Sequence, residues 1–202
     1  MTYSVVSRTP QFSSGRVIDV VTDEVTMPGG GTALRDWVRH PGAVGVVAVD
    51  DADRVLLVHQ YRHPVGRELW ELPAGLLDVD GEKAVVSAGR ELAEEADLRA
   101  ARFEVLVDLL TTPGASDEAI RLYLARGLSP VPAEARFTRT DEEAGMTTRW
   151  FGLDEAVDLV LAGTIENAAA AAGILAATAA RARGWKGLRG VNAPWAARPS
   201  RV

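Results

Sequence analysis

Short apolar segments separated by polar turns are spread over the first three quarters of the chain. The apolar run 43–49 is followed by the acidic turn 50–53 and by a second apolar run at 55–59, which predicts a β-hairpin. Further apolar segments predict strands at residues 17–26, 32–38, 70–72, 105–109, 120–125 and 146–151. We expect these segments to supply the β-structure of the protein.

Longer segments predict three helices. They cover about residues 83–96, 154–162 and 167–183, and the alanine content of the last indicates close helix packing. Strands before and after a single helix, followed by two helices at the end, are typical of an α/β protein with a mixed sheet flanked by helices.

The chain divides into three parts. The strands at 17–26 and 32–38, joined by a glycine-rich turn, predict a small antiparallel β appendage over residues 1–40. It is too small to bury a core alone, so we expect its apolar surface to pack on a partner subunit. Residues 41–183 form the main domain, and residues 184–202 an irregular or partly disordered tail.

Composition narrows the class of protein. The net charge of −6 argues against a nucleic-acid binder, and the absence of cysteine excludes disulfide scaffolds and thiolate zinc sites. No apolar run approaches the length that crosses a bilayer, and the N-terminus does not resemble a secretory signal, so we expect a cytoplasmic protein. An acidic protein can still bind phosphates when its carboxylates hold divalent cations.

Carboxylates cluster on the helix predicted at 83–96. Glu91 and Glu95 are four residues apart and share one face, and Glu94 lies beside them. Carboxylates on a rigid helix suit Mg²⁺ or Mn²⁺. The alternative is a solvated acidic face stabilised by Arg90 and Glu94. Against this, residues 73–75 predict a tight loop before the helix, whose glycine permits close backbone approach.

The segment 75–98 resembles the Nudix box, in which glycine, five residues, glutamate and seven residues precede Arg-Glu-U-x-Glu-Glu-x-Gly-U, with U aliphatic. Two departures are plain, because six residues separate Gly75 from Glu82 and Asp97 replaces the second glycine. Asp97 can adopt the left-handed conformation of a helix C-cap. Neither departure removes a carboxylate.

The resemblance extends to the ADP-ribose pyrophosphatase subfamily. Residues 60–64 and 69–75 are similar to the segment before its box, and Pro113 lies fifteen residues after Leu98, as in that subfamily. Together the similarity covers about residues 43–161. It implies the Nudix α/β/α sandwich with a mixed sheet.

The resemblance also implies a metal site and a base. The carbonyl of Ala74 and the carboxylates of Glu91 and Glu95 would hold Mg²⁺, or Mn²⁺, while Glu82 would order the loop and pair with Arg90. The base would come from the acidic loop 141–145, where Glu143 is preferred over its neighbour Glu142 because it is nearer the next strand. A solvated loop charge is the alternative.

Three residues are candidates for binding substrate. Arg62 would grip the phosphates, the backbone N–H of Leu76 would bind a phosphate beside the metals, and Glu118 would contact the terminal ribose. The alternatives are a surface salt bridge for Arg62, packing for the Leu76 side chain and a turn acid for Glu118.

The function implied is Mg²⁺-dependent hydrolysis of ADP-ribose to AMP and ribose 5-phosphate by a homodimer. Another nucleoside-diphosphate sugar or dinucleotide pyrophosphatase is the alternative within the family. An ADP-ribose-binding sensor is the alternative outside catalysis, and it is disfavoured because all the acids of the box are present. Neither a membrane nor a nucleic acid is expected as a partner.

Overall fold

Three β-sheets and three α-helices make up the computed structural model, which describes residues 3–13, 17–139 and 145–199. The α-helices are α1 (Ala84–Ala96), α2 (Leu153–Leu161) and α3 (Ala168–Arg181). The strands are β1 (Val5–Ser13), β2 (Asp19–Thr26), β3 (Thr32–Arg39), β4 (Ala43–Ala48), β5 (Arg54–Arg62), β6 (Arg67–Glu71), β7 (Ala74–Leu76), β8 (Leu98–Leu110), β9 (Ala119–Pro130) and β10 (Thr147–Gly152). Two 3₁₀ turns lie at His63–Val65 and Ala133–Ala135.

Strand β4 lies at the centre of the main domain. It pairs parallel with β9 and antiparallel with β7, in a sheet of order β7-β4-β9-β8. Because successive residues of a strand point to opposite faces, Val44 and Val46 pack in the core cluster that includes Leu92 of α1. Val47 packs in the other cluster, with Ile174 of α3. Burial on both faces explains the continuous apolar run.

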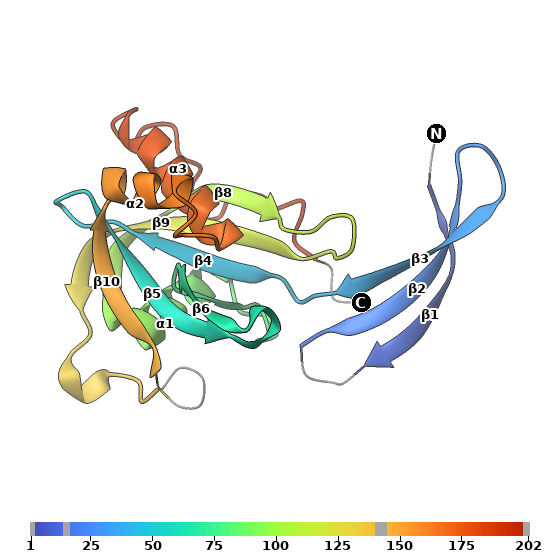
Figure 1. The fold of residues 1–202 in the computed structure, drawn as a ribbon, viewed down its shortest axis with the longest axis horizontal. Coiled ribbons are helices and arrows are strands. Elements are labelled where there is room, and N and C mark those ends of the chain that lie inside the picture. Colours follow the sequence, from blue (N-terminus) through green and yellow to red (C-terminus); the bar gives the residue numbers. More distant parts are fainter. Residues whose placement is uncertain (1–2, 14–16, 140–144, 200–202) are drawn as a thin grey trace.

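The helices cover both sides of the sheets. In Figure 1, α2 and α3 lie above β4 and β9, whereas α1 lies below them. The main domain contains a second sheet, of order β10-β5-β6. The predicted α/β/α sandwich with a mixed sheet is confirmed.

Helix α3 packs closely on the sheet through its small residues. A Cβ atom at Gly173 would lie 2.9 Å from side-chain atoms of both Leu72 and Val47, so any larger residue would force these buried side chains to shift. The expected close packing of this alanine-rich helix is confirmed. Over the described ranges, every helix falls short of the length and hydropathy needed to span a bilayer.

A separate antiparallel sheet of order β1-β2-β3 projects from the domain (Figure 1). Gly30 and Gly31 adopt positive φ angles of 90° and 77° in the β2–β3 turn, as expected for the glycine run. Strand β1 was not expected, because it carries Pro10 and polar residues at an edge. The sheet is tied to the domain where Val38 N–H donates to the Ala115 carbonyl at 2.8 Å.

Two local expectations are wrong, and a third, the irregular tail, is correct but lacks the packing that the structure adds. Residues 74–76 form a short edge strand and not a tight loop, because they pair with β4. Strand β8 begins at Leu98, well before residue 105, because its first half pairs with β9 despite its polar residues. The described tail is irregular but packed: Trp185 and Trp195 lie against the core clusters, and Val105 N–H donates to the Arg189 carbonyl.

Candidate active site

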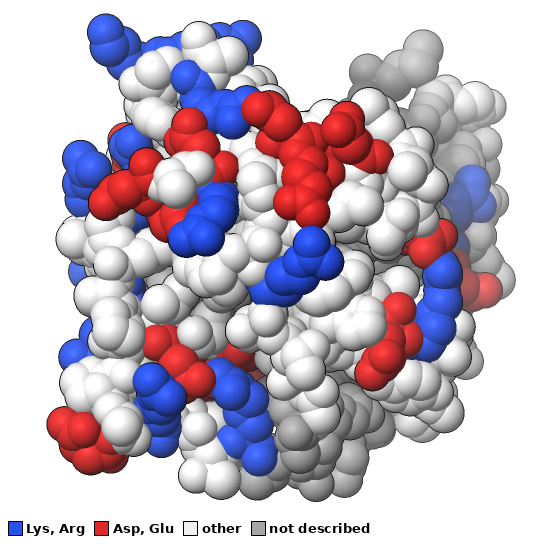
Figure 2. Space-filling view, turned by 60° about the vertical axis from the view of Figure 1, so that its left-hand side comes forward, with Lys and Arg blue, Asp and Glu red and all other residues white. Residues whose placement is uncertain are grey.

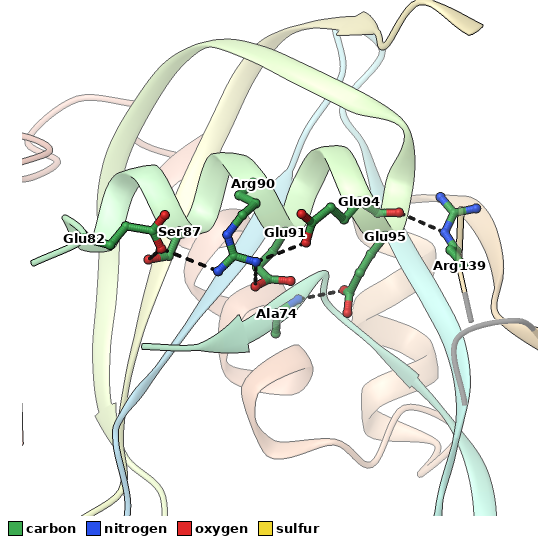
Figure 3. A network of polar contacts seen from close by, with 8 residues as sticks. All are labelled: Ala74, Glu82, Ser87, Arg90, Glu91, Glu94, Glu95 and Arg139. Atoms are coloured by element: carbon green, nitrogen blue, oxygen red, sulfur yellow. Dashed lines mark hydrogen bonds and ion pairs between the residues drawn. The ribbon is translucent and has the colours of Figure 1, made fainter. Parts of the chain in front are cut away.

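Helix α1 and strand β7 face each other through two acidic side chains. Glu95 accepts a hydrogen bond from the Ala74 N–H at 2.9 Å, and both Glu91 and Glu95 are buried (Figure 3). Gly75 makes the approach possible, because a Cβ atom there would lie 2.1 Å from the Glu91 carboxyl carbon. Gly75 does allow a close approach to the backbone, as expected, and the group that approaches it is the carboxylate of Glu91.

Arg90 holds the acids of α1 together. Its NH1 donates to Glu91 at 2.7 Å and to Glu94 at 3.1 Å, and its NH2 lies 3.5 Å from Glu82 (Figure 3). Burial alone would lower the pKa of the guanidinium, but the three carboxylates together raise it. One arginine thus screens three acids that would otherwise repel one another. The expected pairing of Glu82 with Arg90 is confirmed.

Glu82 also binds a hydroxyl at the start of α1. The Ser87 hydroxyl donates to its carboxylate at 2.6 Å, and this bond, helped by the Arg90 charge, lowers the pKa of Glu82. Glu82 therefore anchors the loop to the first turns of the helix. Ser87 was missed from the sequence, where its spacing of five residues from Glu82 was the available signal.

Asp97 ends helix α1 in the left-handed conformation, with φ 53° and ψ 33°, and its N–H donates to the Leu92 carbonyl. The expected C-cap is confirmed. An aspartate also does what glycine cannot, because its carboxylate accepts from Arg139 at 3.0 Å. Arg139 in turn donates to the Glu94 carbonyl at 2.9 Å, one of the carbonyls left unpaired by the helix end. No sequence signal marked Arg139, which lies in an irregular segment.

The backbone of β7 presents polar groups on its outer edge. Leu77 N–H donates to the Gly42 carbonyl and Val46 N–H to the Pro73 carbonyl, so Ala74 and Leu76 occupy the non-hydrogen-bonded positions between these pairs. Their N–H and C=O groups therefore point away from β4, toward the side where Glu95 bonds Ala74. The Ala74 carbonyl and the Leu76 N–H share that edge.

The oxygen atoms of Ala74, Glu91 and Glu95 are chemically suited to bind a divalent cation. A backbone carbonyl and two carboxylates are the hard oxygen ligands that Mg²⁺ and Mn²⁺ prefer, and they come from two adjoining elements. Across the described ranges, however, no three acidic or histidine side chains converge as a ready cation cage. Glu91 is directed to Arg90 and Glu95 to the Ala74 amide in this arrangement.

The other candidate residues lie in different surroundings. Arg62 forms a bidentate salt bridge with the buried Glu71, with Nε–Oε1 and NH2–Oε2 distances of 3.0 and 2.7 Å. A salt bridge was the alternative to phosphate binding for this residue. Glu118 accepts from the Thr111 hydroxyl, and His40 lies 3.8 Å away. Since Ala43 pairs with both Leu76 and Ile120, Glu118 lies at the same end of the sheet as Leu76.

Glu143 and Glu142, the candidates for the base, lie outside the described residues. The segment before them is anchored to α1 through Arg139.

The chain is similar to proteins of one family over most of its length. The family profile described as NUDIX domain matches residues 39–172. An ADP-ribose pyrophosphatase of Mycobacterium tuberculosis is 48% identical over 93% of this chain and 88% of its own length. An ADP-ribose pyrophosphatase of Bacillus subtilis is 36% identical over 74% of this chain and 79% of its own.

The chain is also similar to two further proteins. The methanol dehydrogenase activator of Bacillus methanolicus is 40% identical over 76% of this chain and 80% of its own. The crystal structure of an ADP compounds hydrolase superposes with a TM-score of 0.76 at 19% identity, covering 91% of this chain and 97% of that chain, which shows a shared fold. By profile and by sequence, the chain belongs to the Nudix family and is a Nudix hydrolase.

Proposed function

We propose that this chain hydrolyses the pyrophosphate bond of ADP-ribose, so that water adds and AMP and ribose 5-phosphate leave. The observation that carries the proposal is the 48% identity with the mycobacterial ADP-ribose pyrophosphatase, which extends over 93% of this chain and so beyond the Nudix domain. The buried acids of α1 facing the edge of β7 support a site for a diphosphate.

Nudix hydrolases use divalent metals, and we propose Mg²⁺, with Mn²⁺ as a substitute. The Ala74 carbonyl, Glu91 and Glu95 would hold it. When bound, the cation neutralises charge on the diphosphate and lowers the pKa of a water molecule. Arg90 lowers the repulsion between the acids.

The remaining roles follow from the chemistry of the side chains. Glu143 would take the proton of the attacking water. The guanidinium of Arg62 and the Leu76 N–H would bind phosphate oxygens, the first already oriented by its fork onto Glu71. Glu118 would accept a hydrogen bond from the terminal ribose.

We propose a homodimer joined through the N-terminal sheet. That sheet projects from the domain and exposes large apolar side chains, including Phe12 and Leu34 at 57% and 67% exposure. Several large exposed apolar side chains on one projecting sheet indicate an interface. Nucleic acid is not a proposed partner, because basic and acidic side chains are interspersed on the face shown in Figure 2. The expected place of action is the cytoplasm.

The test is AMP release from a panel containing ADP-ribose, other nucleoside-diphosphate sugars and dinucleotides, with Mg²⁺ or with EDTA. Glu95→Gln should lower kcat/KM about a thousandfold, because several kcal/mol of metal stabilisation are lost. It should leave the fold intact, since glutamine can still accept from Ala74. Glu104→Gln on β8, which disturbs an ion pair with Arg126 of β9, is the matched control and should retain activity.

Three outcomes would contradict the proposal. Full activity of Glu95→Gln would refute the metal assignment. Faster turnover of another substrate would show that ADP-ribose is not the preferred substrate. Tight ADP-ribose binding without turnover would favour the sensor.

A further inference from the structure

The carbonyl end of helix α1 carries three acids. Glu94 and Glu95 lie in its last turn and Asp97 caps it, while the sequence Ala-Glu-Glu-Ala at 93–96 provides no basic residue. The carbonyl end of a helix has a partial negative charge, so acids there weaken the turn. Asp97 adds a further cost, because its φ of 53° is a conformation that suits glycine better than any residue with a side chain. The turn that carries Glu95 therefore needs support from outside the helix.

Arg139 supplies a positive charge at this helix end. Its guanidinium bridges two acceptors, since Nε donates to the Glu94 carbonyl at 2.9 Å and NH2 donates to the Asp97 carboxylate at 3.0 Å. Figure 3 shows Arg139 beside the last turn of α1, with its bond to Glu94 drawn. The side chains of Arg139 and Asp97 are only 23% and 28% exposed, so solvent screens this ion pair less than it screens a pair on the open surface.

Asp97 is also held through its backbone. Its N–H donates to the Leu92 carbonyl, and its carbonyl accepts from the Val131 N–H at 2.8 Å. The segment 131–139 is thus attached to the end of α1 at Val131 and again at Arg139. A glycine at position 97, as in the Nudix box, would keep both backbone bonds and lose the bond to Arg139. The contribution of the aspartate side chain is therefore the second attachment.

We propose that Asp97 and Arg139 are positioning residues that hold the last turn of α1, and with it the backbone of Glu95, in the geometry that binds the divalent cation. Neither is proposed to touch the metal or the substrate. The inference rests on the proposed function through the metal role of Glu95. If Asp97 were only a tolerated departure from the box, Asp97→Gly would leave metal binding unchanged and stabilise the protein, whereas the positioning role predicts weaker metal binding.

The affinity of the full chain for Mn²⁺ without substrate, measured from the electron paramagnetic resonance signal of free Mn²⁺, tests the role directly. Asp97→Gly and Arg139→Ala should each weaken binding about tenfold, the lower end of the range for groups that hold metal ligands in place. Asp97→Asn should stay within about threefold of wild type, because asparagine tolerates the left-handed conformation and keeps an oxygen acceptor. Arg136→Ala is the matched control, since its half-exposed guanidinium lies 4.0 Å from Asp97, and it should bind normally.

Turnover gives a second measurement, because a positioning residue and a metal ligand respond differently to added metal. At limiting Mg²⁺, kcat/KM of Asp97→Gly should fall about tenfold, in line with the loss of affinity. At saturating Mg²⁺ it should return to the wild-type value, since every ligand is still present. Glu95→Gln should not recover, because a ligand is missing.

Melting temperatures of the two single variants, the double variant and wild type test whether the two side chains act together. In the Arg139→Ala background, Asp97→Gly should raise the melting temperature by about 2–4 °C, because glycine adopts the left-handed conformation readily and removes an acid from the helix end. In the wild-type background this rise should be absent, since the substitution also removes the bond to Arg139. An equal rise in both backgrounds would show that the pair is uncoupled and would overturn the inference.

The outcomes also separate this inference from the proposed function. Unchanged Mn²⁺ affinity in Asp97→Gly, together with weakened affinity in Glu95→Gln, overturns the positioning role and leaves the metal assignment in place. Weakened affinity in Asp97→Gly, with no hydrolysis of ADP-ribose by wild type, supports the positioning role and refutes the proposed reaction. A wild-type protein that does not bind Mn²⁺ overturns both the metal assignment and the positioning role.

Discussion

The contact between Gly75 and Glu91 gives a sharp test of how the site is built. Replacing Gly75 with alanine would place a Cβ atom 2.1 Å from both the carboxyl carbon and one oxygen of Glu91, where real Cβ atoms essentially never come within 3.0 Å. The carboxyl group must therefore move by about 0.9 Å or more, and a displacement of that size in an active site costs about a hundredfold in rate.

The effect on stability should be smaller than the effect on rate. The Glu91 side chain can swing aside, but it then loses its 2.7 Å bond to Arg90. We expect a loss of about 1–3 kcal/mol in the free energy of unfolding, the usual range for overpacking. The assays are AMP release under saturating Mg²⁺ and urea unfolding of the same preparation.

Gly89 on the same helix is the matched control. A Cβ atom there would meet only the Phe103 ring, at 4.0 Å, which is an ordinary contact. Gly89→Ala should therefore raise the free energy of unfolding by about 0.5–1 kcal/mol and leave the rate unchanged. In a Glu91→Ala background, Gly75→Ala should cost no further stability, because the clash is gone. A well-folded Gly75→Ala variant with unchanged kcat/KM would refute the reasoning.

Two further predictions concern pH and assembly. The pKa of Glu82 is lowered below its ordinary 4.5, chiefly by the Ser87 hydroxyl, so its stabilising contribution is present above the unfolded-state value and is lost as the pH falls through the folded-state value. The stability gap between wild type and Ser87→Ala, measured by urea unfolding, should be larger at about pH 7 than at about pH 3; an equal gap would exclude the linkage. Leu34→Asp, at a side chain 67% exposed on β3, should convert a dimer to a monomer by light scattering, while Leu161→Asp, at 76% exposure on α2, should not. A monomeric wild type, or a dimeric Leu34→Asp variant, would show the proposed interface to be wrong.

Local patterns were enough to predict the helices and the family. Helix α1 was expected at about 83–96 and spans Ala84–Ala96, because its spacing of apolar and acidic positions is a property of a single helix. The left-handed Asp97 was predicted for the same reason, since a helix end is a local structure. The family and its acids followed from the residues 75–98 alone.

Only the tertiary structure decided how those groups meet. The contact of Gly75 with Glu91, the bond from Ala74 to Glu95 and the anchoring of α1 by Arg139 join residues far apart in the chain. The tail shows the same limit, since its irregular sequence concealed the packing of Trp195 on Arg121. A sequence pattern shows which face of a helix or strand is apolar or charged. The partner of that face is set by contacts between residues far apart in the chain, and such contacts leave no periodic pattern in the local sequence.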